Sequence, residues 1–179
     1  MMRTSLLRAS LAAALICSAA GAFAQGKTSK TAQTFITKAV QGNLAEVAMG
    51  QLAQKNGASD EVKKYGQQLV TDHTAAGQKA TAAAEQMGVT PPTEPSRKQK
   101  ADHAKMSKMT GEAFDRAFVR HMVADHKKEV AAHKKAAKMK TEAAAGYATG
   151  ALPALEQHLE TAQGLSKSVG GKGSGKSAM

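Results

Sequence analysis

The chain has 179 residues, and its 25 Lys and Arg against 14 Asp and Glu give a formal net charge of +11. This length fits one domain that can bury a sizeable core. Such a positive balance is common in nucleic-acid-binding proteins, but only 3% of residues are aromatic, so the basic residues lack interleaved stacking platforms and we expect no nucleic-acid binding. The apolar residues are mostly Ala, Leu, Val and Met, which suits closely packed helices better than sheets.

The N-terminal segment has the order of a secretory signal peptide. Arg3 and Arg8 precede an uncharged run, rich in Leu, Ile and Ala, that ends in the small-x-small pattern Ala22-Phe23-Ala24. We therefore expect residues 1–24 to be removed near Ala24-Gln25 and the mature protein to be periplasmic or secreted. The run is shorter than the roughly 20 residues of a membrane span, and no later segment approaches that length, so we expect no transmembrane segment.

The one cysteine, Cys17, lies inside this predicted signal. A lipoprotein signal would also end at a cysteine, but Ile16 stands where lipoprotein cleavage prefers a small residue. Removal of the signal leaves no cysteine, which excludes disulfides, thiolate metal sites and cysteine nucleophiles from the mature chain.

A helical hairpin is predicted after a polar leader at residues 25–30. The first helix spans about Thr31 to Asn56 and ends at Gly57. The second has Ser59 as its N-cap, acidic residues in its first turn, and continues to Met87.

A long crossover follows this hairpin. Residues 89–110 contain three prolines and many charges, with room for a short helical piece at about 98–106. Such a segment connects helices at opposite ends of a bundle.

Two more helices are predicted over about 111–140 and 141–165, and Pro153 should kink the second of them. Residues 166–179 form a Gly, Ser and Lys tail without the apolar residues that would offset the entropy of ordering. Two short hairpins joined by one long link predict an all-α fold, an antiparallel four-helix bundle over 25–165 with its crossover between helices two and three.

Each predicted helix carries one ionisable side chain within its apolar stripe. These side chains lie among small and apolar residues at spacings of three and four, and they are Glu46, His73, His126 and His158. Each is near the middle of its helix. Burial of one such group without a partner costs several kcal/mol, so four at a similar depth should meet one another.

One carboxylate and three imidazoles suit a divalent metal such as Zn²⁺, Fe or Mn. Asp72, Asp125 and Glu129 are candidates for further ligands or for groups that orient the ligands. A hydrogen-bonded network without metal would also explain the pattern, and so would exposed side chains if the helical phase differs by one position.

The remaining histidines lie off these stripes. His103, in the crossover, and His121 and His133, in the third long helix, are predicted at the surface. Glu129 and His133, four residues apart, could pair or chelate a metal together.

Four stretches resemble a ferritin-like family of exported bacterial proteins. They are Leu44-Ala45-Glu46-Val47, Asp72-His73-Thr74, Phe114-Asp115, and Leu152-Pro153 to His158. The family is catalogued as a domain of unknown function, numbered forty-one forty-two, and its members are often called predicted outer membrane proteins.

The resemblance covers about Thr34 to Leu165 and implies a ferritin-like four-helix bundle. Its matching polar positions are Glu46, Asp72, His73, His126 and His158. It implies no activity. Ferritin-like di-iron enzymes use a Glu-x-x-His spacing, which this sequence lacks, so their chemistry is not carried over.

The sequence therefore predicts an exported metal-binding bundle with a role in envelope or metal stress. No nucleophile–base pair or phosphate loop is visible, and no catalytic residue is predicted. The alternative is a non-enzymatic envelope protein that binds anionic lipid or a protein partner, with the polar cluster structural. Its basic face would be Lys127, Lys128, Lys134, Lys135 and Lys138.

Overall fold

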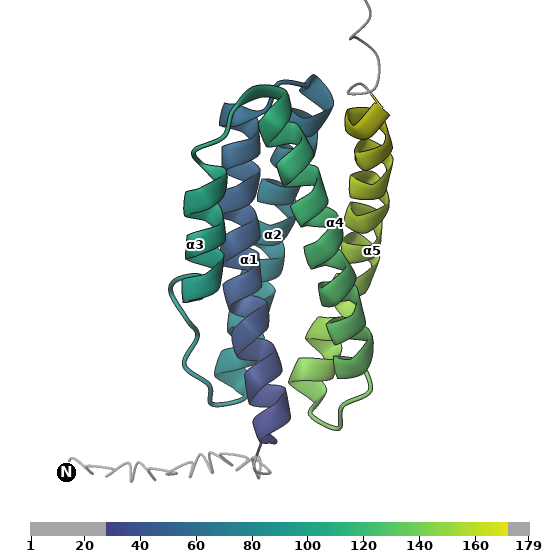
Figure 1. Cartoon of the computed structure of the whole chain (residues 1–179). Helices are drawn as coiled ribbons and strands as arrows, with labels where there is room; N and C mark the ends of the chain where they lie inside the picture. The colour runs from purple at the N-terminus through teal and green to yellow at the C-terminus, as the bar shows by residue number, and fades with distance from the viewer. Residues whose placement is uncertain (1–27, 172–179) are drawn as a thin grey trace, which may run out of the picture.

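The computed structural model describes residues 28–171, which form five helices (Figure 1). Their bounds are α1 (Lys30–Asn56), α2 (Asp60–Gln86), α3 (Arg97–Met106), α4 (Gly111–Ala136) and α5 (Glu142–Gly171). The predicted signal peptide and the last residues of the predicted tail lie outside the described residues.

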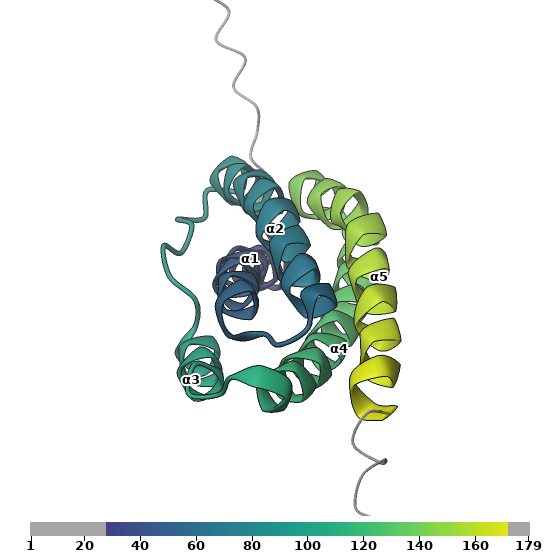
Figure 2. The ribbon, with the colours of Figure 1, turned by 90° about the horizontal axis from the view of Figure 1, so that it is seen from above.

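The four long helices pack as two antiparallel hairpins, α1 with α2 and α4 with α5 (Figures 1 and 2). The crossover leaves the lower end of α2 and returns to the upper end through α3, which lies beside α1 (Figure 1). Helices α2 and α4 therefore run in the same direction. The predicted all-α bundle, with its long crossover between the second and third long helices, is confirmed.

The main differences from the predicted bounds lie in the second hairpin. Helix α4 ends at Ala136, before the predicted end near residue 140, whereas α5 continues past Leu165 to Gly171. Leu165 and Val169 pack against a buried apolar cluster, and this contact offsets the entropy of ordering the start of the predicted tail. Helix α5 also passes through Pro153 without ending, and it is visibly curved in Figure 2.

Side-chain capping explains where α2 and α3 begin. Ser59 is the N-cap of α2, as predicted, and its hydroxyl accepts a hydrogen bond from the Val62 amide. Ser96 forms a capping box with Gln99 at the start of α3.

Helices α1 and α2 meet through their backbones. A Cβ added at Gly50 would lie 2.5 Å from the Gly66 carbonyl oxygen, and a Cβ added at Gly66 would lie 2.7 Å from that of Gly50. Only glycine at both positions allows this approach. On the same two helices, the side chains of Asn43 and His73 form a hydrogen bond of 3.0 Å.

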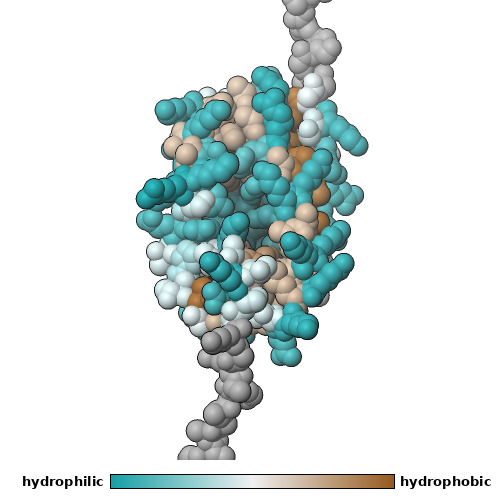
Figure 3. Space-filling view, turned by 60° about the horizontal axis from the view of Figure 1, so that its bottom comes forward, coloured by the Kyte–Doolittle hydropathy of each residue, from teal (hydrophilic) through white to brown (hydrophobic). Residues whose placement is uncertain are grey.

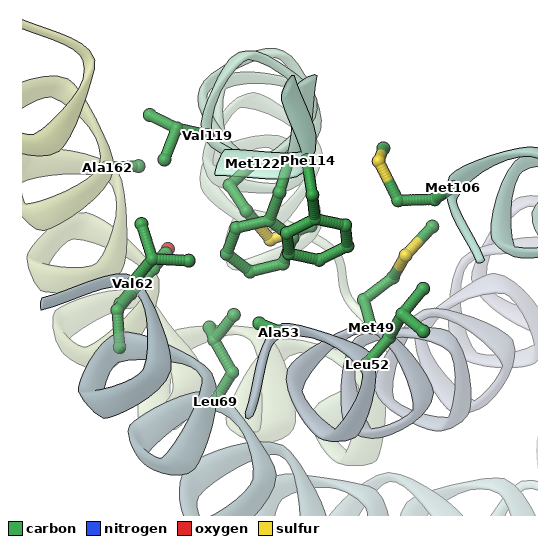
Figure 4. Close-up of a cluster of buried hydrophobic side chains, with 12 residues drawn as sticks. Met49, Leu52, Ala53, Val62, Leu69, Met106, Phe114, Val119, Met122 and Ala162 are labelled. Atoms are coloured by element: carbon green, nitrogen blue, oxygen red, sulfur yellow. The ribbon is translucent and has the colours of Figure 1, made fainter. Parts of the chain in front are cut away.

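The core consists of two apolar clusters. The upper cluster, near the α1–α2 turn, contains Met49, Leu69, Phe114, Phe118 and Met122 among its members (Figure 4). The lower cluster, near the opposite end, is built mainly from small and aliphatic residues of α1 and α2, with Met87 at the C-cap of α2 and Ala144 from α5. The residues of the two helices are Ala32, Ile36, Ala39, Val40, Ala80, Ala83 and Ala84. The middle level of the bundle lies between these two clusters and belongs to neither.

The outer surface is mostly hydrophilic when the lower end is turned forward, with apolar residues in small separate patches (Figure 3). The five lysines predicted on the basic face are exposed, four of them on α4 and Lys138 just after its end, and Lys134 pairs with Glu156 at 2.7 Å. Within residues 28–171, no helix combines the length and apolar character needed to cross a membrane.

Asp115 ties the start of α4 to the α1–α2 turn. Its side chain is only 3% exposed and accepts hydrogen bonds from the amides of Ala58 at 3.0 Å and Ser59 at 2.9 Å. Asn56 adds a second link, because its side-chain Nδ2 donates a hydrogen bond to the Met109 carbonyl at 2.8 Å. These bonds fix the two hairpins relative to each other at the upper end.

We predict that Asp115→Ala lowers the free energy of unfolding by about 2–4 kcal/mol, because it leaves two backbone donors without their acceptor. Urea denaturation followed by circular dichroism measures the change. Glu112→Ala, one turn earlier on α4 and exposed, is the control and should shift stability by less than about 1 kcal/mol. Equal losses in the two variants would contradict the role given to Asp115.

Candidate metal centre

The structure places Glu46, His73, His126 and His158 in the middle of the bundle, one on each long helix. None of the four is more than 3% exposed. These four residues lie between the upper and lower apolar clusters. Along its helix or hairpin, each of them comes after a residue of one cluster and before a residue of the other. The bundle therefore contains a buried polar layer.

Three of these side chains form a triangle of imidazoles. The ring centroids of His73, His126 and His158 are 5.2 to 5.7 Å apart. One ring nitrogen from each lies within 4.8 Å of the other two. We call His73, His126 and His158 the histidine triad.

Each ring of the triad is oriented by a hydrogen bond at its other nitrogen. His73 Nδ1 bonds Asn43 Oδ1 at 3.0 Å, and His126 Nδ1 bonds the Met122 carbonyl at 3.0 Å. His158 Nε2 bonds Asp72 Oδ2 at 2.8 Å. Because all three partners are oxygen acceptors, the bonded nitrogen carries the hydrogen and the remaining nitrogen keeps its lone pair.

The orientation of the Asn43 amide is itself fixed. Its Nδ2 donates to the Ala39 carbonyl at 2.8 Å and to the Tyr147 hydroxyl oxygen at 2.8 Å, which leaves Oδ1 to accept from His73. A chain of hydrogen bonds thus connects α5, α1 and α2 to one ring of the triad.

The lone-pair nitrogens of the triad are His73 Nε2, His126 Nε2 and His158 Nδ1. All three are buried, and none has a hydrogen-bond partner in the described part of the chain. A buried polar atom without a partner costs free energy. Three such atoms that converge from three helices are the arrangement that a metal ion would stabilise.

A second group of ligand atoms adjoins the triad at His126. Carboxylate oxygens of Glu46 and Glu129 and a ring nitrogen of His126 lie within 4.8 Å of one another. One oxygen of each carboxyl group is buried and has no hydrogen-bond partner within residues 28–171. Glu129, proposed from sequence as a further ligand, therefore belongs to the buried layer.

The two other acidic residues singled out from the sequence are more exposed. Asp72 contributes through its hydrogen bond to His158, and its side chain is 38% exposed. Asp125 is 30% exposed and lies 4.0 Å from Lys128 Nζ. Its charge also raises the pKa of Glu46, so it is close enough to influence the layer.

Burial determines the charge state of the layer. It raises the pKa of Glu46 well above its usual value, and the negative charges of Glu129 and Asp125 add to the effect. Burial, with the charge of Asp125, raises the pKa of Glu129 to about 8. Burial likewise lowers the pKa of His126 to about 4 and that of His73 well below its usual value. At neutral pH these imidazoles are neutral, the form that binds metals.

The prediction for His133 was wrong. Its side chain is only 5% exposed and packs against the rings of Phe35 and Tyr147, with centroids 5.1 and 5.6 Å away. Its Nδ1 bonds the backbone carbonyl of Glu129 at 2.8 Å, so the two residues do not pair through their side chains. The inward stripe of α4 simply continues from Val130 to His133, three residues later.

His103 and His121 are half-buried rather than fully exposed. Asn43 was missed because an amide has no titratable group to draw notice, although it precedes Glu46 by one helical turn. Tyr147, whose hydroxyl bonds Asn43, was not singled out from the sequence either.

Pockets reach the layer from different sides. A pocket of about 860 Å³ between α2 and α5 is lined by His73, His158, Glu129 and His133 among others. A smaller pocket of about 360 Å³, bordered by α1, α3 and α4, is lined by Glu46, Glu129 and Asp125. Ions and small molecules thus have approaches to the buried groups.

Fold and site together define a helical bundle built around a buried cluster of histidines and carboxylates. The sequence model of the family described as "Domain of unknown function (DUF4142)" matches residues 17–165, so the chain belongs to that family. The membership of this family predicted from the sequence is confirmed. Comparisons with curated proteins and with solved structures gave no match.

The raised pKa of Glu129 has a consequence for stability. In the unfolded chain this carboxyl loses its proton near its usual pKa of 4.5, whereas in the folded protein it keeps the proton up to about pH 8. Between these values the folded state binds more protons, so its stability falls as pH rises. The buried histidines act in the opposite direction, but only between about pH 4 and their usual value of 6.5.

We therefore predict that the metal-free protein loses roughly 2 kcal/mol of stability through Glu129 between about pH 6.5 and 8, above the usual pKa of the histidines. Glu129→Gln should flatten this fall and raise the melting temperature at pH 8. Thermal melts in chelator at pH 6.5, 7.2 and 8 measure it, with the exposed Glu112→Gln as control. A melting temperature that rises over this interval would contradict the assigned protonation.

Proposed function

We propose that the protein binds a divalent transition metal through the histidine triad, with a carboxylate of Glu46 or Glu129 as a further ligand. Two observations carry the proposal. One nitrogen from each ring of the triad lies within 4.8 Å of the other two. Each ring also has one buried nitrogen without a partner in the described residues and is oriented by an acceptor at its other nitrogen. Metal-binding histidines in proteins have this second hydrogen bond almost without exception.

The donor set supports Zn²⁺, Fe or Mn as the bound ion. Three imidazoles leave room for a carboxylate or an exchangeable ligand in a four-coordinate site, and imidazole with carboxylate suits all three metals. One nitrogen of each ring lies within 4.8 Å of the others, so a single ion could lie between the three rings, with Zn–N bonds of roughly 2.0–2.1 Å. A bound cation would also favour the ionised form of Glu46 and Glu129, whose pKa values burial and nearby acidic groups raise.

The setting we propose is outside the cytoplasm. The order of residues 1–24, with basic residues, an apolar run and a small-x-small end, supports export of the mature chain. In the periplasm or outside the cell, a bundle of this kind would sequester or buffer metal ions under envelope or metal stress. The direction of the four long helices and the long crossover also support a ferritin-like relationship.

Metal titration of the untagged protein tests this function. We expect one ion of Zn²⁺, Mn²⁺ or Fe²⁺ per chain by calorimetry, and a melting temperature raised by roughly 5–10 °C at one hundred times Kd. His73→Ala, His126→Ala and His158→Ala should each weaken binding at least about 100-fold, because each removes a ligand.

His103→Ala is the matched control, since His103 lies on α3 and belongs to neither group of possible ligand atoms. Glu46→Gln and Glu129→Gln conserve side-chain size and identify the carboxylate ligand, because the variant that removes it should weaken binding. Absence of binding for all three metals, or equal affinity in the triad variants and the control, would refute the proposal.

A further inference from the structure

Gly42 is a buried glycine in the middle of α1 that the backbone conformation does not require. Its φ is not positive, so alanine could adopt the same helical conformation. Glycine inside a helix is also less favourable than alanine, because it loses more conformational freedom on folding. A glycine at this position therefore indicates that a side chain here would meet a neighbouring group.

The group that a side chain at Gly42 would meet is the carboxyl group of Glu129, on α4. A Cβ added at Gly42 would lie 2.8 Å from Glu129 Oε1, and outside the adjoining part of α1 no other atom of the described residues lies within 4 Å of it. At Gly50 and Gly66, by contrast, each missing Cβ makes room for the backbone of the other helix. Gly42 makes room for the end of one flexible side chain.

The Glu129 side chain lies next to all three members of the histidine triad. Glu129 comes three residues after His126 on α4, so the two are neighbours on the helix surface. One of its oxygens lies within 4.8 Å of a His126 ring nitrogen. Glu129 also lines the pocket between α2 and α5 together with His73 and His158, whereas Glu46 lines only the pocket bordered by α1, α3 and α4.

The Glu129 carboxyl has room to move. Its Oε2 has no hydrogen-bond partner within residues 28–171. Among the residues that line the two pockets, Glu129 alone belongs to both, so it borders open space on two sides. The room left at Gly42 therefore decides whether the carboxyl lies against α1 or is displaced.

We propose that Gly42 is a positioning residue for the metal site, and that its missing side chain keeps the Glu129 carboxylate where it can become a ligand of the ion. The inference rests on the proposed metal binding and deepens it, because it assigns the carboxylate ligand to Glu129 rather than to Glu46.

Gly42→Ala in the untagged mature protein tests the proposal, because it adds the carbon that the Glu129 oxygen now excludes. The oxygen can move aside, since it ends a flexible side chain, and alanine favours the helix. We expect a melting temperature in chelator no lower than that of the parent. By calorimetry, Zn²⁺ affinity should fall roughly 10- to 100-fold, the loss typical when the support of a metal ligand is removed. A residue with a packing role alone would lower stability instead.

A double-mutant cycle tests whether the loss of affinity passes through the Glu129 carboxylate. Once Glu129→Gln has removed the ligand, adding Gly42→Ala should weaken Zn²⁺ binding no further. In the Glu46→Gln background, Gly42→Ala should keep its full effect. Gly164→Ala on α5 is the matched control, because a Cβ added there has no atom within 4 Å, and it should leave the affinity unchanged.

Several outcomes would overturn the inference and leave metal binding by the triad intact. They are a Zn²⁺ affinity of Gly42→Ala equal to that of the parent, an equal loss in the Glu129→Gln background, or a lower melting temperature of the metal-free variant. A loss of affinity in Glu46→Gln but not in Glu129→Gln would do the same without any substitution at Gly42. Absence of Zn²⁺ binding in the parent would end both the inference and the proposed function.

Discussion

The buried polar layer is the feature on which the rest of this bundle depends. Glu46, Glu129 and the histidine triad lie between two apolar clusters, and their unpartnered atoms are buried. Each such atom costs free energy in the folded state, and the apolar clusters on either side must offset that cost. A protein selected only for stability would fill this level with leucines, so the layer points to function.

The layer also determines how the helices are joined. Asn43 links α1 to His73 on α2 and to Tyr147 on α5, while Asp72 links α2 to His158 on α5. The Tyr65 hydroxyl adds a bond to the His158 carbonyl at 3.1 Å. These directional bonds fix which faces of the helices meet, something that packing of small alanine side chains alone specifies poorly. Ligand orientation and bundle geometry therefore arise from the same contacts.

Local signals in the sequence were sufficient for the helices and for part of the site. Caps such as Ser59 and the three-four spacing of apolar residues located the elements, and one polar interruption on each stripe identified Glu46 and the triad. The end of α5 was placed too early, because the packing of Val169 on the upper cluster is a tertiary contact that composition does not reveal. The burial of His133 was missed because the stripe was ended one turn too soon.

The partners of the ligands could not be predicted, because they depend on distances between helices. That Asp72 meets His158, and that Asn43 meets Tyr147, follows from the relative rotation of helices far apart in sequence. The pocket between α2 and α5 could not be predicted for the same reason. An alanine-rich helix face is compatible with close packing and with a pocket, and only the distance between the helices decides which one forms.

X-ray absorption spectroscopy of the Zn²⁺-loaded protein tests the central claim, that the buried layer is a metal centre, most directly. This account predicts multiple scattering from three imidazole rings at about 2.0–2.1 Å, with one or more oxygen ligands completing the site. A spectrum dominated by oxygen ligands, or one with a single imidazole, would place the ion elsewhere on the protein and contradict the account.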